Sequence, residues 1–422
     1  MNRLKISEKW ISAEDAEPLQ QATAADLCIE IGSSILTQNI NIWTERVQNT
    51  IAVSTYPLAM WFANSWWRLL YESSHAYGDN TSLSWKQSHY LGAANHGFVW
   101  PYIVFSNDGS CINVWSEVIP APKQSANFIQ QHDSSFLIPP ADFQHEIASF
   151  IERTLLQLKS SGLNNELSEL WKIIGNEMND EKLSSARILE AKMGYDPEEC
   201  PEALLNTVME YQKQTGKNAL SELAPLLGHT PSAILEINNL QGLTGTPQVA
   251  CLPNSPTTTP WKQGVEAAHS LRKKAGLSDK PITNAQLCDF LGVRKADFEN
   301  DNLGAECKLP LTVGKIADSG NYHFILRKRM QTGRRFEMAR LLGNYITQSP
   351  TEKEWLVCTD YSTAAQKAQR AFAAEFLCPF EALRAFLDND FSEARQEEAA
   401  NHFMVSPLTI NSTLKNNHYL TA

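Results

Sequence analysis

Residues 334–346, RRFEMARLLGNYI, are the stretch that decides the fold of the C-terminal part of this chain. They follow the segment GNYHFILRKRMQTG (320–333) and precede the segment QKAQRAFAAEFLCP (366–379). Farther out lie NAQLCDFLGV (284–293) and AANHFMVSPLTINSTLKNNHYL (399–420). The order and spacing of these segments are typical of one known family of domains.

The segments resemble the ImmA/IrrE family of zinc metallopeptidase-like proteins. Residues 284–293 match its leading helix, which ends at a Leu-Gly-hydrophobic turn, and residues 399–420 match its closing helix-turn-helix-like element. Residues 320–346 match a hairpin and the active-site helix, usually Arg-Phe-x-x-Ala-His-Glu-x-Gly-His. Residues 366–379 match the second site helix, usually Glu-x-x-Ala-Asn-x-Phe-Ala-Ala-x-x-Leu-x-Pro. The resemblance implies a zincin-like domain of helices plus a small β-sheet over residues 261–422.

The zinc chemistry of that family does not carry over to this sequence. In H-E-x-x-H, two histidines four residues apart face one metal ion, and the glutamate activates the metal-bound water. The histidine positions here are Arg340 and Asn344, the glutamate position is Leu341, and the third ligand position is Gln366. Arginine stays protonated and leucine has no base to offer. We therefore expect no metal ligand, no catalytic residue and no cofactor at this site.

The substituted positions still define a vestigial active-site pocket. If the fold is kept, Arg340, Asn344 and Gln366 converge, with Glu337 one turn before Arg340 on the same helix. The favoured interpretation is that Arg340 fills the vacated metal cavity and ties the helices together. The alternative is a pocket that binds a small anion or the end of a peptide.

A dense basic run precedes and enters the same helix. It contains Arg327, Lys328, Arg329, Arg334 and Arg335. Such a run is able to contact nucleic-acid phosphates or an acidic protein surface. The competing interpretation, which we favour, is a solvated hairpin whose arginines pair with acids inside the domain.

The rest of the chain predicts an α+β protein with further parts. Residues 1–140 show strand-length apolar runs, an apolar helical segment from Pro57, and a hairpin signal at Asn107-Asp108-Gly109, which together indicate a Trp-rich mixed α/β domain. Residues 141–240 form an acidic segment of successive amphipathic helices. Residues 241–260, rich in Pro, Thr and Gly, are predicted to be a linker. Trp61, Trp66 and Trp67 are expected in the core, and His89 in a hydrogen-bonded structural role.

Composition limits the classes of function. The net charge is −11, which disfavours general DNA coating. The eight cysteines include no C-x-x-C, so buried reduced thiols are expected rather than disulfides or a zinc ribbon. The sequence shows neither a membrane-length apolar run nor a secretory signal, so a cytoplasmic protein without membrane contact is expected. The oligomeric state is left open.

Three functions are compatible with these features. The first is a non-catalytic ImmA/IrrE-like regulatory or protein-interaction subunit with a protein partner. By resemblance, its setting is a bacterial or prophage stress, toxin–antitoxin or phage-defence system. The second is a zinc metalloendopeptidase that cleaves a regulator protein. The third is a DNA-binding transcriptional regulator that uses the basic run.

Overall fold

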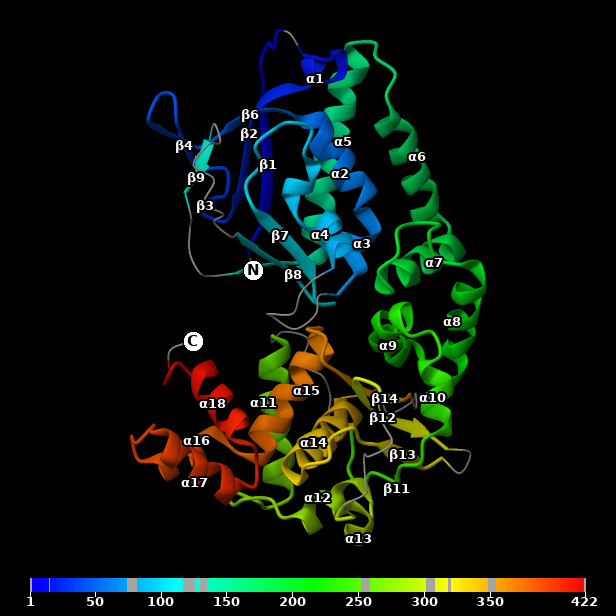
Figure 1. The fold of residues 1–422 in the computed structure, drawn as a ribbon, viewed down its shortest axis with the longest axis vertical. Helices are drawn as coiled ribbons and strands as arrows, with labels where there is room; N and C mark the ends of the chain where they lie inside the picture. The colour runs from blue at the N-terminus through cyan, green and yellow to red at the C-terminus, as the bar shows by residue number, and fades with distance from the viewer. Residues whose placement is uncertain are drawn as a thin grey trace. The chain divides into compact units, whose positions relative to one another are not determined.

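The computed structural model describes residues 2–14, 16–73, 82–116, 126–129, 135–251, 259–300, 308–317, 320–347 and 354–420. The protein is mixed α+β, as predicted, with helices and several small antiparallel sheets (Figure 1). It divides into two compact units, Met1–Leu205 and Asn206–Ala422. Within the described residues, no helix combines the length and the apolar character needed to cross a membrane.

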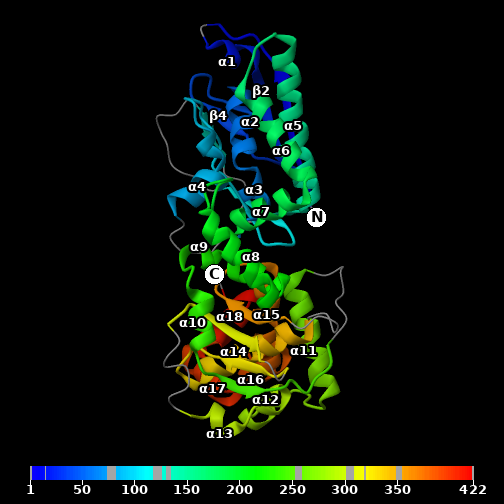
Figure 2. The same cartoon turned by 90° about the vertical axis from the view of Figure 1, so that its right-hand side faces the viewer.

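Unit 1 is built on an antiparallel sheet with strands β1 (Leu4–Trp10), β2 (Ala24–Ile31), β3 (Ser34–Ile35) and β6 (Ile51–Ser54). Helix α5 (Pro140–Ser160) packs on β1, and α2 (Thr55–Asn64) packs on α5 and on α6 (Glu166–Asn179). Figure 2 shows this unit turned by 90°, with α5 and α6 beside α2. Alternation of buried and half-buried residues along β2 matches a sheet with one face more deeply covered than the other.

The predicted hairpin at 107–109 is present. Strand β7 (Ile103–Asn107) pairs with β8 (Ile112–Ser116), which also pairs with β10 (Phe136–Ile138). Asp108 accepts hydrogen bonds from the backbone nitrogens of Ser110 and Cys111, which fixes the turn. A further small sheet joins β4 (Asn39–Asn41), β5 (Arg46–Gln48) and β9 (Ala126–Phe128).

The aromatic core of unit 1 contains the tryptophans expected there. Trp61, Trp66 and Trp67 are all buried. Trp66 and Trp67 belong to α3 (Trp66–Tyr71), which packs on α7 (Glu181–Lys192). Helix α4 (Leu83–His89) packs on α3 and on the short 3-10 helix η1 (Leu91–Ala94). Helix α1 (Pro18–Ala22) packs on α2 and α5.

Unit 2 contains a sheet in the order β11 (Leu243–Gly245), β13 (Tyr322–Ile325), β12 (Leu311–Ile316) and β14 (Leu356–Thr359). The hairpin expected within residues 320–333 differs from the structure: β13 pairs with β12, which precedes that segment, and residues 326–330 form no strand. Helix α14 (Gln331–Thr347) and helix α15 (Ala364–Leu377) lie beside β14, and α15 packs along α11 (Pro260–Lys274) (Figure 1). The α11–α15 contact is close because Gly264 has no side chain. A Cβ there would lie 2.2 Å from the carbonyl oxygen of Ala368.

Local sequence signals explain how the helices of unit 2 begin and end. Thr283 and Gln286 form a capping box at the start of α12 (Asn284–Leu291), which stops at Gly292 in the left-handed region. A short helix, α13 (Lys295–Phe298), follows. Ser406 caps α18 (Pro407–Asn416), with Pro407 in its first turn. Helices α16 (Phe380–Leu387) and α17 (Glu393–Phe403) lie between α15 and α18 in the sequence.

The predicted acidic segment 141–240 is helical but is divided between the two units. Helices α5, α6 and α7 belong to unit 1, while α9 (Lys217–His229) and α10 (Ala233–Asn239) belong to unit 2. Helix α8 (Glu202–Thr215) spans the division. Helix α9 packs on β14. Beside this contact, the backbone nitrogen of Trp355, which precedes β14, donates to the carbonyl oxygen of Thr215, which precedes α9.

The predicted linker 241–260 also differs in part from the structure. Residues 243–245 form strand β11, which pairs with β13 through Leu243 opposite Phe324. Gly242 lies so close to Phe324 that an added Cβ would be 2.6 Å from the Phe324 carbonyl oxygen. Residues 252–258 of this segment lie outside the described residues.

The seven described cysteines are all free thiols, as expected from their spacing. Five are buried, and burial raises the pKa of the Cys358 thiol to about 12 and of the Cys288 thiol to about 11. Cys307 lies outside the described residues.

Candidate functional site

Three of the residues predicted to form a vestigial pocket, Arg340, Asn344 and Gln366, lie where α14, α15 and β14 meet in unit 2. Helix α15 begins at Thr363, whose hydroxyl accepts a hydrogen bond from the backbone nitrogen of Gln366 and so places Gln366 in the first turn. Gly343 allows α14 to approach α15, because an added Cβ would lie 2.6 Å from Phe372 Cδ1. The close packing of α14 on α15 brings the pocket positions of both helices together.

Arg340 occupies the centre of the cluster and is only 5% exposed. Its Nη2 donates to Gln366 Oε1 at 2.6 Å and to the Thr359 carbonyl oxygen at 2.7 Å. Its Nε is buried and has no partner among the described residues. Arg340 therefore bridges α14, β14 and α15, in the position where the family resemblance would place a metal ligand.

Gln366 is fully buried and uses both ends of its amide. Its Oε1 also accepts from the Thr359 backbone nitrogen at 2.9 Å. Its Nε2 donates to the Val357 carbonyl oxygen at 3.0 Å and to Glu222 Oε2 at 2.9 Å. Asn344 Nδ2 donates to the same Val357 carbonyl oxygen at 3.2 Å. The structure thus brings together Arg340, Asn344 and Gln366, the three positions predicted to converge.

The other two predicted pocket residues take different places. Leu341 is fully buried and belongs to the hydrophobic core of unit 2. Glu337 accepts hydrogen bonds from the backbone nitrogens of Arg327 and Lys328 and pairs with the Arg327 side chain at 3.3 Å. Burial raises the pKa of Glu337 despite these donors. Glu337 therefore holds the segment before α14 and does not contact Arg340.

This donor set does not fit zinc. A guanidinium has no lone pair to give to a metal, and the Gln366 oxygen already accepts two hydrogen bonds. Within the part of the chain that the structure describes, no group of three or more His, Cys, Asp or Glu side chains is arranged to hold a metal ion. We derive no metal-dependent step from these residues.

Sequence reasoning missed three contributors to the cluster. Glu222, from α9, accepts from Gln366 and from the Thr363 hydroxyl. Arg370 lies one turn after Gln366 on α15 and donates to the carbonyl oxygens of Thr359 and Tyr361. Arg370 could have been predicted from the sequence, because its i, i+4 spacing from Gln366 places the two side chains on one face of the helix. Nothing in the sequence indicated Glu222 or the Thr359 backbone.

The basic run is mostly internal to unit 2. Arg334 donates to the carbonyl oxygens of Phe298 and Asn300. Arg335 is 1% exposed and donates to two carbonyl oxygens and to Asn284, and burial lowers its pKa to about 10.

The remaining residues of the run divide into paired and exposed side chains. Arg327 binds Asp360 through two hydrogen bonds of 2.7 Å. Lys328 and Arg329 are exposed. Of the five residues predicted as a possible partner or nucleic-acid contact, these two present their side chains to solvent.

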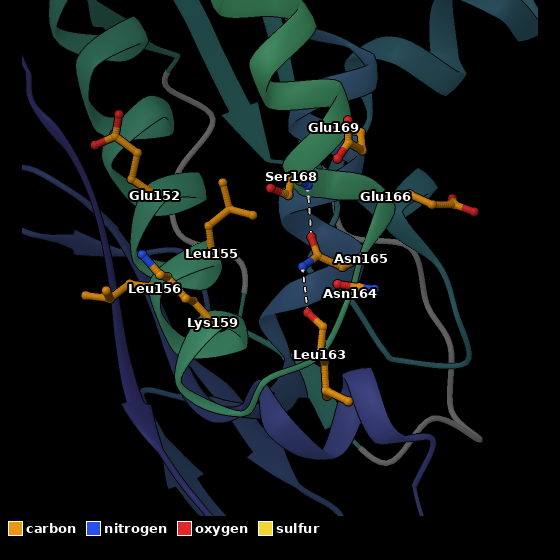
Figure 3. Close-up of a pocket in the computed structure, with 10 residues that line it drawn as sticks. All are labelled: Glu152, Leu155, Leu156, Lys159, Leu163, Asn164, Asn165, Glu166, Ser168 and Glu169. Atoms are coloured by element: carbon orange, nitrogen blue, oxygen red, sulfur yellow. Dashed lines mark hydrogen bonds between the residues drawn. The ribbon is translucent and has the colours of Figure 1, made fainter.

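An open cleft with a volume of about 760 Å³ lies in unit 1, between the end of α5 and the start of α6 (Figure 3). Leu155 and Leu156 project from α5, and Asn165 caps α6 by accepting from the Ser168 nitrogen. The lining residues combine apolar and charged side chains: Glu152, Leu155, Leu156, Lys159, Leu163, Asn164, Asn165, Glu166, Ser168 and Glu169. It is an open surface cleft without a catalytic constellation.

His89 has the structural role predicted for it. It is fully buried in unit 1, where Nδ1 lies 2.8 Å from the Phe105 carbonyl oxygen and Nε2 lies 3.0 Å from Glu72 Oε2. Its ring stacks on Trp85 with centroids 4.2 Å apart. Glu72 also binds Arg68. These contacts join α3, α4 and β7 inside the unit.

Comparison with known proteins adds no relative. No protein-family model matches the chain, no curated protein matches it, and no solved structure matches it. The functional argument therefore depends on the residues and their geometry.

Proposed function

We propose that this chain is a non-catalytic, ImmA/IrrE-like regulatory or protein-interaction subunit. The observation that carries the proposal is the hydrogen bond from Arg340 to Gln366 at 2.6 Å. These residues occupy two positions where the resembled family has metal ligands. Here they bind each other and the backbone of β14, so the pocket serves to hold helices and strand together.

The chemistry of the pocket positions supports this proposal. Arg340 is a permanent cation in a buried position, and a cation at the metal position repels a second cation. Leu341 is in the apolar core, where the resembled active site needs a base. The rival function, a zinc endopeptidase that cleaves a regulator protein, would have to use other residues.

By the same resemblance, we propose a cytoplasmic role in a bacterial or prophage stress, toxin–antitoxin or phage-defence system. A protein partner is the expected ligand of such a subunit. The observation that favours unit 1 as the partner surface is a set of exposed apolar side chains on α5, α6 and α7. Leu156 is 70% exposed, Ile173 is 54% exposed and Leu183 is 44% exposed. Exposed apolar side chains that form a contiguous patch mark protein-binding surfaces, and these three are the candidates for such a patch.

The test of the catalytic part of the proposal is metal analysis of the purified full-length chain. We expect far less than one zinc ion per chain. Stoichiometric zinc that disappears in Asn344→Ala and Gln366→Ala variants would contradict the proposal and favour the peptidase.

The interaction part is tested by co-purification from the native host. We expect a partner that is retained with wild type and with the pocket variant Arg340→Met. The same partner should be lost with Leu156→Glu and Ile173→Glu. Equal recovery with all four proteins would place the binding surface elsewhere.

A further inference from the structure

The guanidinium groups of Arg340, which is buried, and of Arg370, which is half-buried, approach the same carbonyl oxygen in unit 2. Arg340 Nη2 donates to the Thr359 carbonyl oxygen at 2.7 Å, and Arg370 Nη1 reaches the same oxygen at 3.5 Å. One carbonyl oxygen therefore serves two cations. Burial and the neighbouring charge of Arg340 lower the pKa of Arg370 to about 10.

Neither guanidinium forms an ion pair with a carboxylate among the described residues. Among the described residues, Arg340 donates hydrogen bonds to Thr359 and Gln366, and Arg370 donates to the Thr359 and Tyr361 carbonyl oxygens. The nearby acids are engaged elsewhere: Asp360 by Arg327, and Glu222 by Thr363 and Gln366. The charges of Asp360 and Glu222 favour the cationic form of Arg370 without a direct ion pair, so this arrangement lacks a directly bonded anion.

Unused donors remain on both side chains. Arg340 Nε is buried without a partner, and Arg340 Nη1 has no described partner but is not enclosed. Arg370 is only half-buried and its Nε likewise has no described partner. The carbonyl oxygens of Thr359 and Tyr361 hold the two planar groups in place. Fixed guanidinium donors recognise the oxygens of phosphate and carboxylate groups well.

We propose that Arg340 and Arg370 form a binding site for a small oxyanion, the class that includes phosphate and the carboxylate at a peptide's C-terminus. The anion accepts hydrogen bonds from the free guanidinium nitrogens and reduces the repulsion between the two cations. The site rests on these two side chains alone, so it does not depend on the proposed interaction role.

The test is calorimetric titration of the full-length chain at low ionic strength. Three probes separate the sources of the anion: inorganic phosphate, N-acetyl-glycylglycine with a free carboxylate, and the same peptide as its C-terminal amide. We expect saturable binding of at least one of the two oxyanions and none of the amide. Phosphate binding alone assigns a phosphate-type ligand, and carboxylate binding alone assigns a peptide end.

Variants link that binding to the site. Arg370→Gln is expected to weaken binding about tenfold, the effect of losing one charge-assisted contact. Arg370→Lys keeps the positive charge but lacks the planar set of guanidinium donors, so a smaller loss of affinity is expected. It serves as the second variant if Arg370→Gln does not fold. Arg384→Gln is the control, because Arg384 is an exposed arginine of the same unit that pairs with Glu381. It should bind like wild type.

Three results would overturn the inference: no saturable binding of either oxyanion, equal binding of the amide, or unchanged affinity in folded Arg370 variants. The zinc content of the same samples is measured as well. It tests the proposed function, so a failure of anion binding and a failure of the proposed function can be distinguished.

Discussion

Arg340 on α14 and Gln366 on α15 are joined by a buried hydrogen bond of 2.6 Å, although 25 residues separate them in the chain. Arg340 also donates to the carbonyl oxygen of Thr359 on β14, and Gln366 accepts a hydrogen bond from the Thr359 backbone nitrogen. Three elements of unit 2 therefore meet in one polar contact. A buried polar group that loses its hydrogen-bond partner lowers the free energy of unfolding. The contact therefore favours this one packing of the three elements over alternatives.

A double-mutant cycle measures this contact. Arg340→Met and Gln366→Met each leave buried polar partners unsatisfied, so each should lower the free energy of unfolding by about 1–3 kcal/mol. The double variant should lose less than the sum of the two, with a coupling of about 0.5–3 kcal/mol. Urea unfolding of the four proteins gives the values. A matched cycle of Arg340→Met with exposed Arg384→Ala should be additive, and equal coupling in both cycles would show that the pair does not interact.

The close approach of α11 and α15 gives a second prediction. In Gly264→Ala the new methyl group would lie 2.2 Å from the Ala368 carbonyl oxygen, so the helices must move apart. We expect a loss of about 1–3 kcal/mol in unfolding free energy, as for overpacked cores. Gly175→Ala in α6 is the control, because its added Cβ meets no atom within 4 Å. That variant should be unchanged or slightly more stable, and equal behaviour of the two would argue against this helix contact.

The buried Glu72 of unit 1 gives a prediction about pH. Burial raises its pKa, but the hydrogen bonds and charges of His89 and Arg68 outweigh this and hold the pKa below the ordinary value of 4.5. A carboxyl whose folded pKa is depressed stabilises the fold above its unfolded pKa. That stability is lost as the pH falls from about 4.5 through the folded pKa.

Glu72→Gln tests this dependence, because glutamine does not titrate. The stability difference between wild type and Glu72→Gln should be largest above pH 4.5 and should shrink as the pH falls. Hydrogen exchange of α3 and α4 amides reports on this unit alone. Asp390→Asn is the control, since Asp390 is exposed on the surface of unit 2 and does not contact this network. A difference that stays constant from neutral to acid pH would contradict the prediction.

Local signals allowed much of the fold to be predicted from the sequence. The Asn107-Asp108-Gly109 turn and the end of the helix at Gly292 each depend on a few adjacent residues, and the structure has both. Long-range contacts were not accessible in this way. Glu222 meets Gln366 across 144 residues, and amphipathic helices 141–240 do not specify which unit they pack on.

The arginines of the basic run show the same limit. Arg334 and Arg335 look like surface charges in the sequence, yet both are buried. The carbonyl oxygens that bind them belong to Phe298, Asn300, Ile282 and Met404, all remote in the chain. Because backbone acceptors carry no sequence signature, their position became evident only in the folded unit.

We propose that Arg340, Asn344 and Gln366 keep the relative placement of the ligand positions of a metallopeptidase site without its ligands. The most direct measurement is the zinc content of a variant that restores them: Arg340→His, Leu341→Glu, Asn344→His and Gln366→Glu together. Two histidines at i, i+4 and a glutamate on the adjoining helix would then face one ion. We predict about one zinc per chain in the folded variant and far less in wild type. A folded variant that binds no more zinc than wild type would contradict it.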